Sequence, residues 1–148
     1  MKKEYKSSLI FNIKGLYFIG IFLVLNLFFF RSFAQQTNWV VPNYAINVKN
    51  PLAGNNSVLA DARTLYIANC GPCHGTNGKG DGPAAPGLNP KPADHTSAAV
   101  QSETDGSLFW RLSEGHKPMP AYKNIFSEHQ RWELIDYIRT LAKGYKKK

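Results

Sequence analysis

The chain has 148 residues, of which 43% are hydrophobic and 19% charged, and its formal net charge at pH 7 is +8. From residue 35 onward the net charge falls to +4, and three of those positive charges are the last three residues. The remaining sequence is nearly neutral, which excludes the clustered basic face that nucleic-acid binding requires. Its length suffices for one small domain.

Residues 1–34 have the pattern of a secretory signal peptide. Lysines near the start precede an apolar run over residues 16–30. Ser32 and Ala34 then occupy the small-residue positions that a signal peptidase accepts. The alternative is an uncleaved N-terminal anchor, associated with the membrane through residues 16–30, since a spanning helix needs about 17–25 apolar residues. Either interpretation predicts an extracytoplasmic protein, in the bacterial periplasm.

Residues 35–56 are rich in Asn, Pro and Val and show no sustained periodicity. They predict an extended leader that lies over the domain and is anchored by Trp39. Apolar residues then recur at helical spacing over residues 57–69, which predicts a helix with Ser57 as its N-cap.

Residues 75–94 contain five glycines and four prolines and predict an irregular loop. A loop of this length in a small domain is normally functional or wrapped around something. Two further helices are predicted. One spans residues 105–115, and the other begins with a capping box of Ser127 and Gln130 and ends at Gly144.

These elements predict an all-α domain over residues 57–143, with three to four helices and long loops, followed by a basic tail at residues 144–148. Such a domain has a thin hydrophobic core, and scaffolds of this size usually need an additional staple. A buried haem would supply one.

The chain's two cysteines lie in the sequence Cys-Gly-Pro-Cys-His, formed by residues 70–74. The first four residues match thiol–disulfide oxidoreductases, but there the motif follows a strand. A disulfide would close too short a loop to stabilise the fold, and a zinc ion would need about four ligands. With the histidine included, the motif is the attachment site of a c-type haem, in which Cys70 and Cys73 bond to the porphyrin and His74 ligates the iron.

A c-type haem usually has a second axial ligand, and Met119 is the candidate. Apart from Met1 it is the only methionine in the sequence, and it lies between Pro118 and Pro120. A thioether raises the reduction potential relative to a second imidazole. His116, three residues earlier, is the substitute candidate.

The sequence resembles class I c-type cytochromes over residues 57–143, through "CGPCHG", the Pro/Gly loop, "KPMPAY" and "LIDYIRTL". The resemblance implies the small cytochrome c fold with one covalently bound haem c. It also implies that the first and last helices cross at a small residue facing an aromatic one, for which Ala62 and Tyr137 are the matching positions.

The resemblance assigns further residues to the haem pocket. The carbonyl of Pro86 is expected to accept a hydrogen bond from Nδ1 of His74, and Leu88 to pack against the haem. Trp110 and Tyr122 flank the methionine loop, where they either contact the porphyrin or belong to the ordinary core.

The remaining histidines, His95 and His129, are predicted to lie at the surface. Lysines on the two loops around the expected haem edge would form a positive rim for docking an acidic redox partner. They are Lys79, Lys91, Lys117 and Lys123.

The resulting hypothesis is a monohaem one-electron carrier of a respiratory or dehydrogenase chain. It is not an enzyme with its own chemistry, because no catalytic acid/base pair is visible in the sequence. The alternative is a membrane-tethered haem c subunit of a larger respiratory or dehydrogenase complex. A third interpretation, a haem with an open iron position for ligand binding or catalysis, is disfavoured by Met119.

Overall fold

The structure is a computed structural model, and it describes residues 39–145. The predicted signal peptide or anchor and the last three lysines lie outside the described residues. Within residues 39–145, no helix has the length and apolarity needed to cross a membrane.

Three helices of ten residues or more build the domain: α3 (Leu59–Asn69), α6 (Asp105–Glu114) and α7 (Glu128–Thr140). Shorter helical turns are α2 (Asn43–Ile46), η2 (Asn56–Val58), α4 (Gly71–His74), η3 (Ala85–Gly87) and α5 (Ala98–Gln101). The described part of the chain contains no strand, and the predicted all-α fold is confirmed.

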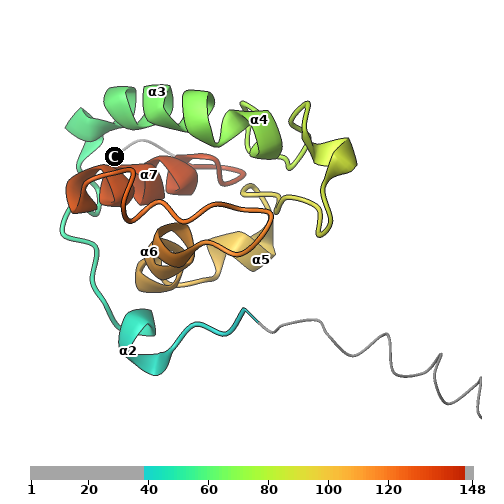
Figure 1. Ribbon diagram of the computed structural model, residues 1–148. Helices are drawn as coiled ribbons and strands as arrows, with labels where there is room; N and C mark the ends of the chain where they lie inside the picture. The colour runs from blue at the N-terminus through green and yellow to red at the C-terminus, as the bar shows by residue number, and fades with distance from the viewer. Residues whose placement is uncertain (1–38, 146–148) are drawn as a thin grey trace, which may run out of the picture. The chain divides into compact units, whose positions relative to one another are not determined.

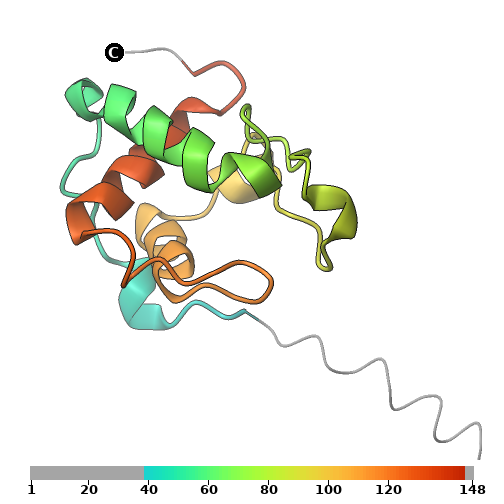
Figure 2. The same cartoon turned by 45° about the horizontal axis from the view of Figure 1, so that its top comes forward.

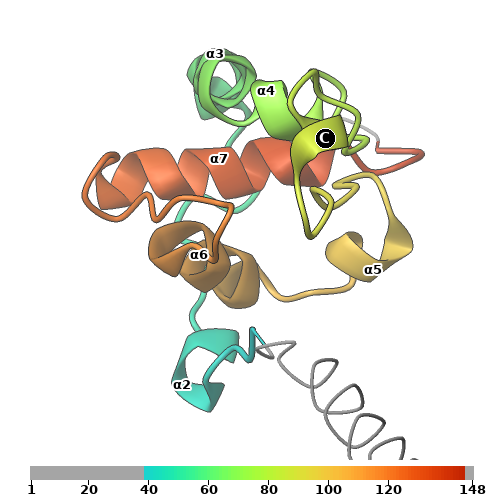
Figure 3. The same cartoon turned by 45° about the vertical axis from the view of Figure 1, so that its right-hand side comes forward.

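Helix α7 lies between α3 and α6 (Figure 1 and Figure 3) and crosses α3 (Figure 2). Ala62 and Tyr66 of α3 and Leu134 and Ile135 of α7 have no exposed surface. Tyr66 also packs on Tyr137 of α7, with 5.0 Å between ring centroids. A small residue at position 62 lets the two helices approach closely, so that the buried aromatic rings fill the crossing.

The helix ends agree with the sequence in part. Ser127 and Gln130 form the predicted capping box, in which each side chain accepts a hydrogen bond from the other residue's backbone N–H. The N-cap prediction is wrong, because Asn55 accepts from the backbone N–H of Ser57 at 3.0 Å and starts a 3-10 turn ahead of α3. Helix α7 ends at Thr140, earlier than predicted.

The segment from Trp39 to residue 56 belongs to the same compact unit as the helices. It contains the short helix α2, where extended chain was predicted. The turn forms because Pro42 O accepts from the N–H of Ala45 at 2.9 Å, and Ala45 is buried. Thr104 Oγ1 donates to Ile46 O at 2.8 Å and fastens the turn to the start of α6.

A partly buried polar cluster around Asn50 joins this segment to α6 and α7. Asn50 Nδ2 donates to Asp136 Oδ1 at 2.8 Å and to Asp105 Oδ2 at 3.3 Å. Arg139 Nε donates to the other oxygen of Asp105 at 2.8 Å. Asp136 Oδ2 is buried and accepts no hydrogen bond from the described residues. Burial raises the pKa of Asp136 to about 6, and the Asp105 carboxylate adds to the rise.

We therefore expect Asp136→Asn to stabilise the protein by about 1–2 kcal/mol near pH 8 and hardly at all near pH 4. The folded-state pKa of Asp136 lies above the ordinary value of 3.8. Its protonated form therefore contributes stability that is complete below about pH 4 and is lost as the pH rises through about 6. Asparagine retains the acceptor for Asn50 and cannot ionise.

Urea unfolding of both proteins at the two pH values measures the effect. Asp61→Asn, at an exposed position of α3, is the control and should give no gain that changes between about pH 5 and 8. An equal gain from Asp136→Asn at both pH values would contradict the assignment.

Candidate haem-binding site

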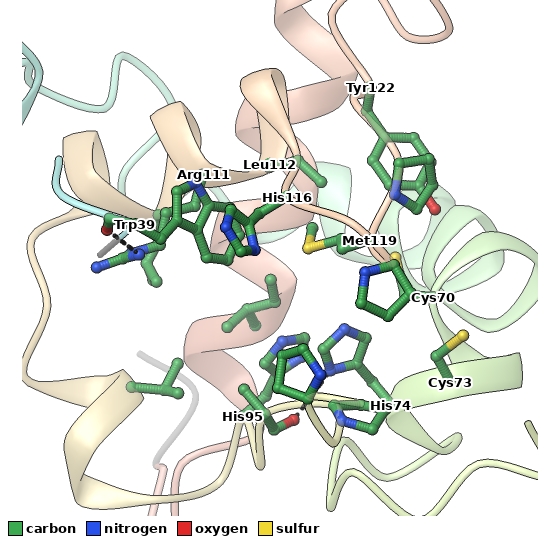
Figure 4. A pocket seen from close by; sticks show the side chains of 18 of the residues that line it. Trp39, Cys70, Cys73, His74, His95, Arg111, Leu112, His116, Met119 and Tyr122 are labelled. Carbon is green, nitrogen blue, oxygen red and sulfur yellow. Dashed lines mark hydrogen bonds between the residues drawn. The ribbon is translucent and has the colours of Figure 1, made fainter. Parts of the chain in front are cut away.

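The predicted attachment and axial residues line one cavity between the helices. With the open solvent at its mouth included, the cavity has about 1110 Å³ of empty space. Figure 4 shows Cys70, Cys73 and His74 on the side of α3 and α4, and Met119 entering from the loop after α6. The rest of the wall is largely apolar, and its members include Leu88, Val100, Leu108, Leu112, Leu134 and Ile138.

The motif is displayed by the tight turn that follows α3. The backbone N–H groups of Cys73 and His74 both donate to Cys70 O, at 3.1 and 2.8 Å. Both thiols are free, and burial raises the pKa of Cys70 to about 12. A thiol–disulfide exchange centre requires a lowered thiol pKa. The environment of Cys70 therefore opposes the oxidoreductase interpretation and suits a thiol held for covalent attachment.

His74 is oriented for metal binding by a hydrogen bond to the backbone. The His74 Nδ1–H donates to Ala93 O at 2.9 Å, which leaves Nε2 as the lone-pair nitrogen. Burial lowers the pKa of His74, so the ring is neutral at physiological pH. A neutral imidazole with its Nδ1 already satisfied is the form that ligates iron.

The prediction that Pro86 supplies this carbonyl is wrong. Pro86 O instead accepts from Lys91 Nζ at 2.7 Å, and Pro86 does not line the cavity. The loop reaches His74 seven residues later, because Gly80 packs against the following segment. A Cβ at Gly80 would lie 2.6 Å from Pro92 O, so only glycine allows this approach.

Met119 is held in a narrow hairpin with His116. The N–H of His116 donates to Met119 O at 3.0 Å, and the N–H of Met119 donates to His116 O at 2.8 Å. The loop returns to α6 where the N–H of Tyr122 donates to Leu112 O at 3.1 Å. These hydrogen bonds fix the position of Met119 relative to α6, and its side chain lines the cavity.

Among the predicted pocket residues, Leu88 and Tyr122 line the cavity. The Tyr122 hydroxyl donates to Asn69 O at 3.1 Å, and burial raises its pKa to about 12. Trp110 does not line the cavity. On α6 the cavity is lined by Leu108, Arg111 and Leu112, whose spacing of three and four residues puts them on one face of the helix, and position 110 falls on the opposite side.

His95 does not lie at the surface, contrary to the prediction, because it lines the cavity beside His74. The two rings stack at 4.1 Å with 17° between their planes. His95 Nδ1 is 2.8 Å from the Tyr66 hydroxyl oxygen. Burial lowers the pKa of His95 to about 3, and the neighbouring His74 adds to the fall. His129 does lie at the surface, with 62% of its side chain exposed.

The wall near His116 comes from Trp39, which the sequence suggested only as an anchor. Trp39 and His116 stack at 5.3 Å between ring centroids. The Arg111 guanidinium lies 4.8 Å from the centre of the indole, and its Nη1 donates to Trp39 O at 2.8 Å. A segment that precedes the helical domain thus closes one edge of the cavity.

Trp39→Ala is expected to lower the free energy of unfolding by about 2 kcal/mol, because stacking and cation–π contacts are lost and the edge is opened. Water admitted at this edge should also lower the reduction potential of a bound haem. Urea unfolding and a redox titration measure both effects. Tyr44→Ala, at a side chain that is 74% exposed on the same segment, is the control. If Trp39→Ala lowered the free energy of unfolding no more than Tyr44→Ala does, the role assigned to Trp39 would be contradicted.

An all-α domain in which Cys-x-x-Cys-His and a methionine line one cavity defines a c-type cytochrome domain. The family model described as Cytochrome c matches residues 59–142, and the chain belongs to this family. Its cofactor is a covalently bound haem c. The donor set fits this group, because two free thiols, an imidazole with an available Nε2 and a thioether line the same cavity.

One solved structure similar to the chain is a reducing HAO-like protein complex from Kuenenia stuttgartiensis. The TM-score is 0.57 and the sequence identity 26%, over 66% of this chain and 48% of the matched chain. The chain thus spans about half the length of that relative. A search of curated protein sequences finds no match.

Proposed function

We propose that the chain is an extracytoplasmic monohaem electron carrier in which His74 and Met119 are the axial ligands of the haem iron. Haem-based electron transfer follows from the cytochrome c family. The observation that carries the finer assignment is the pairing of a neutral His74, with Nε2 available, and a Met119 fixed at the same cavity by a hairpin.

When bound, the haem supplies an iron atom that alternates between the ferrous and ferric states. The protein's part is to hold the group and its surroundings nearly unchanged in both states. Cys70 and Cys73 would bond to the porphyrin, His74 and Met119 would ligate its iron, and the apolar wall of the cavity would exclude water. Small rearrangement between states is what rapid electron transfer requires, and the thioether favours the ferrous form.

A spectroelectrochemical titration of the purified holoprotein tests this function. A carrier should give one reversible one-electron transition, and its ferrous form should not bind added carbon monoxide, because both axial positions are filled. Rapid carbon monoxide binding by the native protein would contradict the proposal and favour a haem with an open iron position.

A haem subunit of a larger respiratory or dehydrogenase complex is the second candidate. The support is the likeness to a chain of a reducing HAO-like protein complex. The predicted N-terminal anchor would then tether the subunit to the membrane. Fractionation of native cells separates the candidates: a free carrier leaves the membrane in a salt wash and migrates at its own mass, whereas a tethered subunit remains with its partners.

Docking at the haem edge would use two of the four predicted lysines. Lys91 Nζ is occupied by carbonyls of its own loop, and Lys123 pairs with Glu114 at 2.8 Å. Lys79 and Lys117 are exposed, and Lys117 lies in the hairpin that carries the methionine. These two charges are the ones available to an acidic redox partner.

Lys117→Gln is therefore expected to slow reduction of ferricyanide severalfold, up to about tenfold, at low ionic strength, because one unit charge about 8 Å from a trianion is worth about 1.5 kcal/mol in water. A cationic oxidant should react slightly faster, and both effects should disappear at about 1 M salt. Stopped-flow kinetics measure the rates, with Lys49→Gln, on the N-terminal segment, as the control. Equal rates for Lys117→Gln and the native protein at low salt would remove Lys117 from the docking face.

A further inference from the structure

The stacked pair of His74 and His95 lies beside the predicted iron position. His95 contacts the flat face of the His74 ring, with centroids 4.1 Å apart and nearly parallel planes. Figure 4 shows the two imidazoles together at one side of the cavity, away from Met119. His95 therefore contacts the predicted histidine ligand and not the predicted methionine ligand.

His95 is held firmly in this place. Its Nδ1 is hydrogen-bonded to the hydroxyl of Tyr66, a fully buried residue of α3. The backbone N–H of His95 donates to Gly78 O at 2.6 Å, and its backbone carbonyl accepts from Gln101 Nε2 at 2.7 Å. Gly78 has a φ of +75°, which other residues rarely adopt, and a Cβ there would lie 3.2 Å from His95 Cβ, so the path of this segment favours glycine.

The two neighbours of His74 restrict different motions. The hydrogen bond to Ala93 fixes the tautomer and aims Nε2 into the cavity. A single hydrogen bond leaves the ring free to rotate about the axis from Nε2 to the iron within the range that the bond tolerates. A second ring packed against its face opposes that rotation, because the imidazole would have to move into occupied space.

We propose that His95 is a positioning residue that fixes the plane of the His74 imidazole relative to the porphyrin. This role of His95 rests on the proposed ligation of iron by His74. The plane of an axial imidazole decides which iron d orbitals its π electrons meet. The orientation held by His95 and Tyr66 therefore sets the magnetic axes of the ferric haem and contributes to its reduction potential.

The chain offers variants that separate stacking from hydrogen bonding. His95→Phe retains a flat ring and loses the bond to Tyr66, whereas His95→Leu retains apolar volume without a flat ring. Tyr66→Phe removes only the hydroxyl that holds His95. His129→Ala, at an exposed histidine of α7, is the control. Each variant is prepared with haem attached, and the paramagnetically shifted haem methyl resonances of the ferric form are recorded with the reduction potential.

For His95→Leu we expect the order or spread of the haem methyl shifts to change, and the potential to move, while the Met119 methyl remains at its ligated position. His95→Phe and Tyr66→Phe both lose the bond between residues 66 and 95 but keep a flat ring against His74, so both should shift in the same direction as His95→Leu but by less. His129→Ala should give native spectra.

Native methyl shifts and potential in both His95→Leu and Tyr66→Phe would overturn the inference. Equal changes in His95→Phe and His95→Leu would also overturn it, because stacking would then not be the cause. Its failure is distinguishable from that of the proposed function. In the former case the native protein still shows a ligated methionine, whereas in the latter that signal is absent from the native protein itself.

Discussion

Met119→Ala is expected to lower the reduction potential by on the order of 0.1–0.2 V, within the roughly 0.8 V range that axial ligation spans. The thioether sulfur is a soft donor that stabilises ferrous iron, and alanine leaves the position to water or to another side chain. The same variant should acquire rapid carbon monoxide binding in the ferrous form. Redox titration and stopped-flow absorption measure the two changes.

The matched control is His116→Ala, because His116 belongs to the same hairpin but stacks on Trp39. If Met119 is the ligand, His116→Ala should keep both axial positions of the iron filled. Its reduction potential should then fall by less than half the amount seen in Met119→Ala. If His116 were the ligand, the two variants would exchange their behaviour. That exchange would contradict the proposed ligation and keep the cytochrome assignment.

The double variant Cys70→Ser, Cys73→Ser is expected to lose cooperative folding. Without covalent haem, the apolar side chains around the cavity face water, and a small domain has only about 5–15 kcal/mol of total stability to lose. Far-ultraviolet circular dichroism should show a large loss of helix at ambient temperature, and no sharp thermal transition should remain.

Cys73→Ser alone should have a smaller effect, since Cys70 can still form one thioether bond and the haem stays in place. A double variant that unfolds cooperatively at the native midpoint would contradict the structural role of the haem. It would also show that the three long helices pack adequately without a cofactor.

Local chemistry explains why parts of the site could be predicted from the sequence. The Cys-x-x-Cys-His spacing places thiols and imidazole within one turn, whatever the rest of the fold. Likewise, the capping box of Ser127 and Gln130 needs only residues three apart. The methionine stood out because it is nearly unique in the chain and lies between two prolines.

The residues that could not be predicted depend on where distant segments run. The resemblance indicated a proline carbonyl, that of Pro86, as the partner of His74, and residues 75–94 contain four prolines. The close packing at Gly80 decided in favour of Ala93. The position of His95 after the proline-rich loop suggested the surface, and its burial depends on Tyr66 of α3. Trp39 lies outside the residues that resemble the family, so no motif indicated its place in the cavity wall.

The most direct test of the account is a proton–carbon NMR spectrum of the ferrous holoprotein labelled with ¹³C at the methionine methyl groups. The sequence contains two methionines, and signal-peptide cleavage would leave only Met119. The account predicts one methyl signal shifted far upfield by the porphyrin ring current, and its loss in Met119→Ala. A methionine methyl at the ordinary position in the native protein would contradict ligation by Met119 and, with it, the closed electron-carrier site.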